Sequence, residues 1–162
     1  QPRKRSFGYE NVPDRYNMRL VIKHYSKLSA DELYDIIKLR VEVFIVEQTC
    51  IYQDLDNLDR DAFHLWLEDD GNILSYCRIL APGVKFSDAS SIGRVISSKR
   101  ALGYGKRIVD FGIEQAKSLY KEHPIRIEAQ KYAEDFYKKC GFTTVSGIFL
   151  VDGIDHVEML YP

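Results

Sequence analysis

A glycine-containing segment in the second half of the chain places the strongest constraint on its fold. Residues 100–107 read Arg-Ala-Leu-Gly-Tyr-Gly-Lys-Arg, after a short apolar run and before a segment with helical periodicity. This order predicts a strand, a tight loop and a helix. Gly103 and Gly105 let the backbone turn sharply and approach a ligand closely. Because the first amides of a helix lack internal partners and carry partial positive charge, the loop predicts an anion site, most naturally for phosphate. A strand-to-helix turn without a ligand is the other interpretation.

Two familiar phosphate-binding motifs fit this segment poorly. A P-loop has the spacing G-x-x-x-x-G-K-[ST], whereas Arg107 stands where the magnesium-binding hydroxyl is required. The dinucleotide-binding fingerprint needs a third glycine at the position of Ile108. Glu128 lies at about the right distance for the acidic residue of that fingerprint, so a dinucleotide site is weakened but not excluded.

The composition indicates an ordinary globular protein. The chain has 162 residues, of which 45% are hydrophobic and 29% charged, enough for one domain with a substantial core. The net charge of −1 argues against a dedicated nucleic-acid-binding protein. Three separated cysteines without a C-x-x-C motif, and four histidines without ligand spacing, predict reduced thiols in the cytoplasm and no metal site. We find no apolar stretch long enough to span a membrane and no signal-peptide pattern.

Residues 1–17 differ in character from the rest of the chain. They are rich in basic residues, contain two prolines and show no periodicity. We expect them to be an N-terminal extension or leader, or equally a native arm that packs elsewhere, followed by a single domain over residues 18–162.

Local signals predict alternating strands and helices. Ser29 and Glu32 have the spacing of a capping box, before a helix that should run to Phe44. Asp-Gly pairs at 70–71 and 152–153 predict two hairpins. The expected order is β-α-β-β-β-α-β-α-β-β, which gives a mixed α/β sheet.

Two motifs at this separation resemble those of the GNAT acetyltransferase superfamily. The first is R-x-x-G-x-G at residues 100–105, and the second is A-x-x-F-Y-x-x-x-G-F at residues 133–142. Residues 39–48 and 152–159 are more specifically similar to the ElaA-like branch of that superfamily. The likeness covers about residues 18–160. The chain departs from the usual residues at Ile51, where that branch has proline, at Asp54, where it has glutamate, and at Gln130, where many superfamily members have asparagine.

The resemblance implies a centrally splayed sheet with helices on both faces, and transfer of an acetyl group from acetyl-CoA to an amine. It implies that the backbone of Val95 and Ile96 binds the pantetheine arm, where an unpaired amide could stabilise an oxyanion. Without the resemblance, both are ordinary core strand residues. The residues expected to contact the cofactor are Val95, Ile96, Arg100, Ala101, Leu102, Gly103, Tyr104, Gly105, Lys106, Gln130, Ala133, Phe136 and Tyr137.

Tyr137 has two interpretations. It shares a helical face with Ala133, Phe136 and Cys140, which favours a core tyrosine. Acyl transfer also expels a thiolate, and a tyrosine with a pKa of about 10 is protonated at neutral pH and can donate to it. The motif match favours the catalytic interpretation.

A general base must also accept a proton from the acceptor amine. The candidates are Glu47, His64, Glu128 and His156. Glu128 is expected beside the thioester, whereas His64 lies in an apolar strand, where a core histidine is more common. We take Tyr137, Glu128 and His64 as the catalytic set, and expect Glu47, Gln48, Tyr52 and His156 to line the acceptor site.

The acidic residues at positions 54, 56, 59 and 61 do not match a calcium-binding loop, because leucine and aspartate stand where that loop needs an oxygen ligand and glycine. We expect a solvated loop, or a surface that attracts a cationic amine.

The leading hypothesis is therefore a cytoplasmic N-acetyltransferase that acts by direct attack of a small-molecule or peptide amine on acetyl-CoA, without nucleic acid or membrane partners. The sequence leaves open whether the protein forms a homodimer. The alternatives are a non-catalytic acyl-CoA-binding module and an acyl-homoserine-lactone-synthase-like acyltransferase, to which residues 40–44 bear a faint resemblance.

Overall fold

The computed structural model describes residues 18–98 and 102–162. The predicted order of elements is confirmed, with one additional short strand, β6, after the last helix. The strands are β1 Met18–His24, β2 Phe63–Asp69, β3 Asn72–Leu80, β4 Ser91–Ser97, β5 Ile125–Gln130, β6 Thr143–Thr144, β7 Phe149–Val151 and β8 Ile154–Tyr161. The helices are α1 Ala30–Arg40, α2 Tyr104–Leu119 and α3 Glu134–Lys139, with shorter helical segments η1 Tyr25–Lys27, η2 Val41–Glu47, η3 Asp59–Asp61 and η4 Lys131–Ala133.

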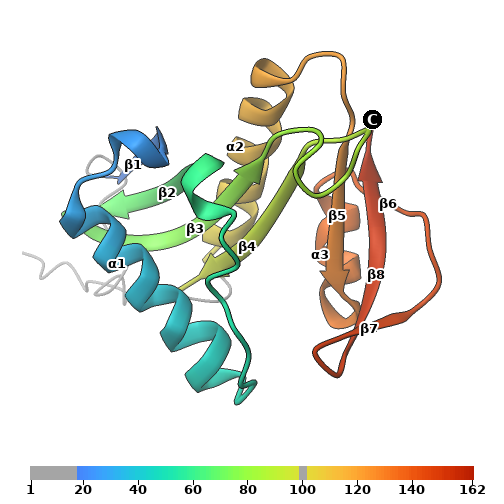
Figure 1. Ribbon diagram of the computed structural model, residues 1–162, viewed down its shortest axis with the longest axis horizontal. Coiled ribbons are helices and arrows are strands. Elements are labelled where there is room, and N and C mark those ends of the chain that lie inside the picture. Colours follow the sequence, from blue (N-terminus) through green and yellow to red (C-terminus); the bar gives the residue numbers. More distant parts are fainter. Residues whose placement is uncertain (1–17, 99–101) are drawn as a thin grey trace, which may run out of the picture.

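The strands form two sheets that separate at the centre of the molecule (Figure 1). The first sheet has the order β1-β2-β3-β4, and the second has the order β5-β8-β6 with β7 paired to β8. The two sheets are joined where Ser90 and Ile125 form a parallel bridge, with Arg126 N donating to Ser90 O at 2.9 Å. Beyond this bridge β4 and β5 diverge. The expected mixed, centrally splayed α/β fold is confirmed.

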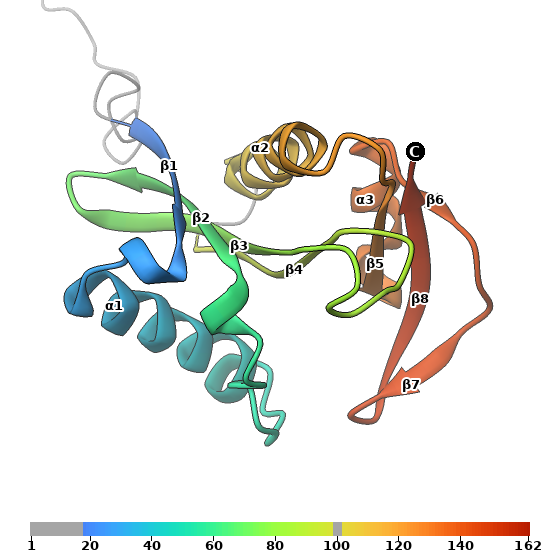
Figure 2. The same ribbon diagram turned by 45° about the horizontal axis from the view of Figure 1, so that its top comes forward.

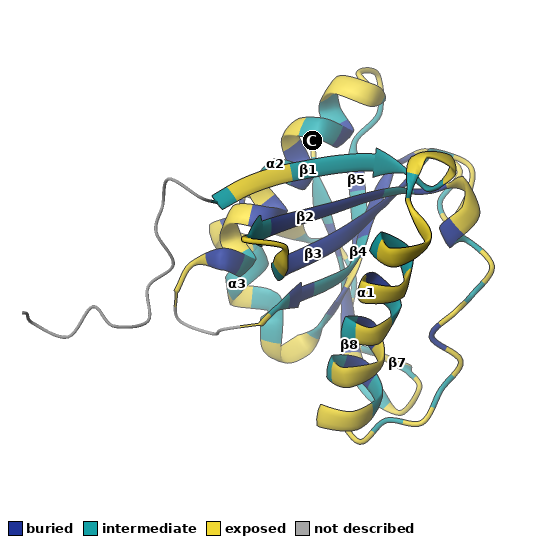
Figure 3. Cartoon of the chain, turned by 90° about the vertical axis from the view of Figure 1, so that its left-hand side faces the viewer, coloured by how far each residue is buried: buried dark blue, intermediate teal, exposed yellow. Residues whose placement is uncertain are grey.

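Helices α1 and α2 cover opposite faces of the first sheet (Figure 2). This arrangement follows from the alternation of side chains along a strand. Leu65 and Cys77 pack on the α2 side, whereas Trp66 and Tyr76 pack on the α1 side. Figure 3 shows the consequence: β2 and β3 are largely buried, whereas the outer face of α1 is largely exposed. Helix α3 lies against β5 and β6 of the second sheet.

The local signals for helix and hairpin ends are confirmed. Ser29 Oγ accepts from Glu32 N at 3.0 Å, and Glu32 Oε1 accepts from Ser29 N at 2.9 Å, so both halves of the capping box are present before α1. Asp70 and Gly71 have φ values of 47° and 78°, and Asp152 and Gly153 have 49° and 76°. Two consecutive positive φ values are the signature of a tight hairpin turn.

The first helix ends differently from the prediction. The α-helical hydrogen bonding stops at Arg40, and residues Val41–Glu47 continue as a π-helix, with Gln48 N donating to Val43 O at 3.3 Å. Phe44 stays buried against the α1 face of the sheet. A π-helical segment is rare and is often found at functional sites. Here it brings the chain from α1 to the gap between the two sheets.

Two parts of the predictions fall outside the described residues: the extension over residues 1–17, and Arg100 and Ala101 of the glycine loop. In the described part of the chain, no helix is long and apolar enough to cross a membrane.

Candidate active site

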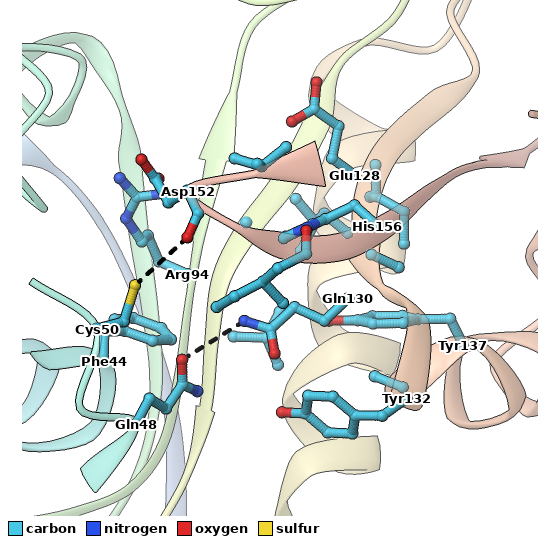
Figure 4. A pocket seen from close by; sticks show the side chains of 18 of the residues that line it. Phe44, Gln48, Cys50, Arg94, Glu128, Gln130, Tyr132, Tyr137, Asp152 and His156 are labelled. Carbon is cyan, nitrogen blue, oxygen red and sulfur yellow. Dashed lines mark hydrogen bonds between the residues drawn. The ribbon is translucent and has the colours of Figure 1, made fainter. Parts of the chain in front are cut away.

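A cavity opens where β4 and β5 diverge (Figure 4). Its walls come from four regions: the end of η2 and the loop after it, β4, β5 with the start of α3, and the β7–β8 hairpin. The residues of the predicted site that line it are Gln48, Tyr52, Val95, Glu128, Gln130, Ala133, Tyr137 and His156.

The β4 wall contains an irregularity in its pairing with β3. Tyr76 lies opposite Ile96 and Arg78 lies opposite Gly93, so residues 94 and 95 together face the single residue Cys77. This is a β-bulge, a feature that is common beside active sites. Arg94 adopts a φ of 54° there. Among the described residues, β4 pairs with β3 and with no second strand along its length, so backbone groups on its other edge face the cavity.

Val95 and Ile96 differ in where their side chains lie. Val95 lines the cavity, whereas Ile96 is 1% exposed and packs in the cluster beneath α1. The resemblance in sequence assigned binding of the pantetheine arm to the backbone of both residues. The buried side chain of Ile96 is therefore compatible with that prediction.

The glycine loop requires glycine for its conformation at Gly103. This residue precedes α2 with a φ of 78°, and its carbonyl accepts the first helical hydrogen bond, from Arg107 N at 3.1 Å. Gly105 has no positive φ, and a Cβ built on it would meet Ser97 Cβ at 3.5 Å, an ordinary contact. The first amides of α2 therefore follow a left-handed residue and have no partner within the helix.

The other loop side chains turn away from this helix end or along it. Tyr104 is buried with Leu67 and Leu74, and Lys106 Nζ lies 2.6 Å from Asp110 on the next turn. Leu102 is exposed. What these residues present to a ligand is mainly backbone.

Tyr137 is both packed and accessible from the cavity. Its ring packs edge-on against Phe136 and Phe142, with centroid distances of 5.1 and 5.9 Å. Its hydroxyl end points into the cavity beside Gln130 (Figure 4) and makes no hydrogen bond with the described residues. Burial raises the pKa of the Tyr137 phenol, so the group stays protonated at neutral pH.

His156 has an orientation suited to accepting a proton. Its Nδ1 lies 2.7 Å from the carbonyl oxygen of Ile154, a contact that requires a proton on Nδ1. In the neutral ring the lone pair is then on Nε2, which has no hydrogen-bond partner among the described residues. His156 is 9% exposed and lines the cavity opposite Gln130, its partner on β5.

The acceptor side of the cavity is mainly polar. Gln130 Nε2 lies 3.5 Å from Gln48 Oε1, so two amide side chains meet across the gap between the sheets (Figure 4). The Tyr52 hydroxyl donates to Asp54 at 3.0 Å, and burial together with that carboxylate raises the pKa of Tyr52 to about 12. Glu47 is exposed and does not line the cavity.

Glu128 lines the cavity and also forms an ion pair. Its Oε2 lies 3.2 Å from Lys85 Nζ, and its side chain points away from Gln130 (Figure 4). The Glu128 carboxylate is therefore occupied by Lys85 and directed away from the amide side chains that meet in the cavity.

The structure argues against His64 as a general base. The side chain is fully buried on the α1 side of the first sheet and does not line the cavity. Both ring nitrogens have partners, Nδ1 with the Tyr76 hydroxyl at 2.7 Å and Nε2 with the carbonyl of Asp59 at 2.9 Å. Burial lowers the pKa of His64, so the ring stays neutral as a structural group. We leave it out of the mechanism below.

The expectation of a solvated acidic loop is wrong for three of the four aspartates. Their carboxylates pair with three arginines that sequence reasoning missed. Arg40 and Arg78 are 1% and 3% exposed, and Asp54 and Asp59 are 5% and 8% exposed. The sequence did contain a signal for this cluster: three arginines at predicted helix and strand positions are equal in number, and opposite in charge, to three aspartates of one loop. The pairs are Arg40–Asp54, Arg40–Asp59, Arg78–Asp56, Arg78–Asp59, Arg94–Asp54 and Arg94–Asp56.

Two further observations bear on the site. Ile51, where the chain departs from the ElaA-like pattern, is 96% exposed, and its side chain does not line the cavity. In the described part of the chain, no group of three or more His, Cys, Asp or Glu side chains could hold a metal ion.

Comparison with known proteins agrees with this architecture. Residues 23–161 match the Acetyltransferase (GNAT) domain family. Protein ElaA of Escherichia coli is 34% identical over 142 residues, which cover 84% of this chain and 91% of that protein. Two solved structures superpose with a TM-score of 0.83 each over 90% of this chain and 99% of theirs: an acyl-CoA N-acyltransferase from Pseudomonas aeruginosa at 36% identity and E. coli ElaA at 31%.

The chain therefore belongs to the GNAT acetyltransferase family and is an ElaA-like member of it. It is an acyltransferase, of a family that uses acyl-CoA as donor. A CoA-dependent acyl-homoserine lactone synthase, BjaI, superposes with a TM-score of 0.72 at 12% identity, over 89% of this chain and 82% of that one. At that identity the likeness concerns the fold alone.

Proposed function

We propose that this protein transfers an acetyl group from acetyl-CoA to the amine of a small molecule or peptide, by direct attack of the amine on the thioester. The proposal rests on one observation: the Tyr137 hydroxyl and the His156 imidazole line the same cavity. Nε2 of His156 has no hydrogen-bond partner among the described residues. The hydroxyl can donate a proton and the imidazole can accept one, as acyl transfer between a thioester and an amine requires.

The features of the chain fit acetyl-CoA. The left-handed Gly103 and the first amides of α2 supply donors for the pyrophosphate. The cavity-facing edge of β4 at Gly93, Arg94 and Val95 offers unpaired backbone groups to the amide-containing pantetheine arm. Ala133 and Tyr137 line the cavity on the side where the sulfur would lie, and the Phe136 ring lies beside Gly105 of the glycine loop.

Each protein group has a defined part in the reaction. Nε2 of His156 accepts the proton that the attacking amine loses, directly or through one water, while the Ile154 carbonyl holds the ring in the required tautomer. A backbone amide of the β4 bulge donates to the carbonyl oxygen as it becomes negative. The Tyr137 hydroxyl gives its proton to the departing thiolate. Gln48 and Gln130 bind the polar atoms around the acceptor amine.

Glu128 is the second candidate for the base. It lines the same cavity, but its carboxylate is paired with Lys85 and directed away from Gln130. We therefore assign the proton acceptance to His156 and expect Glu128 to affect binding of a cationic acceptor.

The experiment measures thiol release from acetyl-CoA with a panel of amines and amino-terminal peptides, and the acetylated product by mass spectrometry. Stimulation by an amine is expected. His156→Gln should lower kcat by about 10²-fold or more, while Glu128→Gln should keep a kcat near that of the wild type. Equal loss in the two variants would refute the assignment of His156, and no product with any acceptor would refute acetyl transfer to an amine.

We also propose one domain over residues 18–162 and a cytoplasmic location. The family match over residues 23–161 supports the first. Three free thiols, at Cys50, Cys77 and Cys140, support a reducing compartment.

A further inference from the structure

The bulge in β4 has a conformation that its own residue does not favour. Arg94 has a φ of 54°, in the left-handed region, although it carries a Cβ. That region costs energy for residues other than glycine, and such a residue persists only where its surroundings hold it in place. Gly93, directly before it, has no positive φ. The chain therefore has a glycine next to the strained position but not at it.

The side chain of Arg94 is held by the buried acidic cluster. Its Nε lies 2.7 Å from Asp54 Oδ1, and its Nη2 donates to the Asp54 carbonyl oxygen at 3.0 Å. Asp56 lies 3.4 Å from the same Nη2, and the Tyr52 ring lies under the guanidinium at 5.8 Å. All of these contacts come from the loop after η2.

Asp54 is itself fixed. Its other carboxylate oxygen accepts from Arg40 Nε at 2.9 Å, and Oδ1 accepts from the Tyr52 hydroxyl at 3.0 Å. Arg40 is 1% exposed and is held at its other end by Asp59 at 2.6 Å. Because displacing one member of a buried ion-pair cluster leaves a charge unpaired at a high energetic cost, the cluster resists displacement.

We propose that Arg94 and Asp54 are positioning residues for acyl transfer: their ion pair holds the left-handed bulge, which aims a β4 backbone amide at the thioester carbonyl. This rests on the proposed function. The guanidinium lines the cavity, but three aspartates in the cluster balance three arginines, so its charge is already neutralised by protein groups. The alternative, direct contact of Arg94 with substrate, is an outcome of the test.

Two variants distinguish an effect of Arg94 through the backbone from its direct contact with substrate. Arg94→Ala and Arg94→Gly both remove the guanidinium, but only glycine tolerates a positive φ without cost. If the side chain acts through the backbone, Arg94→Gly should retain a kcat about five- to thirtyfold above that of Arg94→Ala, per folded molecule, with equal KM for acetyl-CoA. Equal kcat values in the two variants would overturn the proposal and indicate direct contact with substrate.

Asp70 offers a matched control, since it has a φ of 47° in the β2–β3 turn and does not line the cavity. Asp70→Ala and Asp70→Gly should differ in thermal stability and share the wild-type kcat. If Arg94→Ala does not fold, Arg94→Asn is compared with Asp54→Asn instead. Both variants break the ion pair, but asparagine at position 94 tolerates the left-handed region better than arginine does. Arg94→Asn should then exceed Asp54→Asn in kcat, and the reverse order would overturn the proposal.

Amide hydrogen exchange of residues 93–96, followed by NMR, supplies a readout that needs no turnover. Exchange in this segment should be faster in Arg94→Ala than in Arg94→Gly or the wild type, and equal exchange in the two variants would show that the ion pair does not hold the bulge. A wild-type protein that acetylates no amine would refute the proposed function, and the exchange comparison would still decide whether the cluster holds the bulge.

Discussion

Replacing Tyr137 with phenylalanine removes a hydroxyl that has no hydrogen-bond partner among the described residues, and it keeps the ring contacts with Phe136 and Phe142. Because no protein partner is lost, we expect the free energy of unfolding to change by less than about 1 kcal/mol. The same hydroxyl is the proposed proton donor to the thiolate, and general acid catalysis contributes about 10²–10⁴-fold. We therefore expect kcat to fall by at least about tenfold, while the Kd for acetyl-CoA stays nearly constant.

Tyr76→Phe is the matched control. The Tyr76 hydroxyl is fully buried and lies 2.7 Å from His64 Nδ1, on the face of the sheet away from α2. Its removal leaves a buried ring nitrogen without its donor, which costs about 1–3 kcal/mol of stability. The kcat per folded molecule should remain that of the wild type, because Tyr76 does not line the cavity.

The assay combines urea unfolding with steady-state thiol release for both variants. Since burial raises the pKa of Tyr137, the wild-type rate should also show no loss of the acid below about pH 10, the ordinary pKa of tyrosine. The reasoning is refuted if Tyr137→Phe loses several kcal/mol of stability and keeps a normal kcat. The hydroxyl would then be a structural group, and the acid would be a water or another side chain.

Three further predictions concern stability and binding. Burial lowers the pKa of His64 in the folded state, so the unfolded chain binds a proton first as the pH falls: stability should be level above about pH 6.5 and decrease by up to about 1.4 kcal/mol per pH unit below it. In urea titrations at several pH values, His64→Gln should lose this slope, and an unchanged slope would assign it to other groups. Gly103→Ala should lower the free energy of unfolding by about 1 kcal/mol or more and weaken acetyl-CoA binding, because φ is 78° there. Gly105→Ala should bind acetyl-CoA normally in calorimetry. The opposite ranking of the two affinities would show that the space at Gly105 matters more than the turn at Gly103. Acetyl-CoA or CoA at 100 times its Kd should stabilise the fold by about 2.7 kcal/mol and raise Tm by several degrees, and a shift with NAD alone would revive the dinucleotide interpretation.

The sequence by itself determined the features that depend on neighbouring residues. Ser29 and Glu32 cap α1 because their side chains reach each other's backbone within one turn. The Asp-Gly pairs at 70–71 and 152–153 form hairpins because both residues accept a positive φ. The order of elements and the two GNAT motifs are also local patterns, so the fold class followed from them.

Only the tertiary structure decided which polar residues face the cavity. His64 and His156 both lie in strands, yet packing buries the first between Tyr76 and the Asp59 carbonyl and leaves Nε2 of the second without a hydrogen-bond partner among the described residues. From the sequence, Asp54 is expected in a solvated loop. In the fold it pairs with Arg40 and Arg94, which are far from each other in sequence. The physical reason is that burial and charge pairing depend on contacts between distant segments. A local pattern gives the residue type, and the packed fold gives its surroundings.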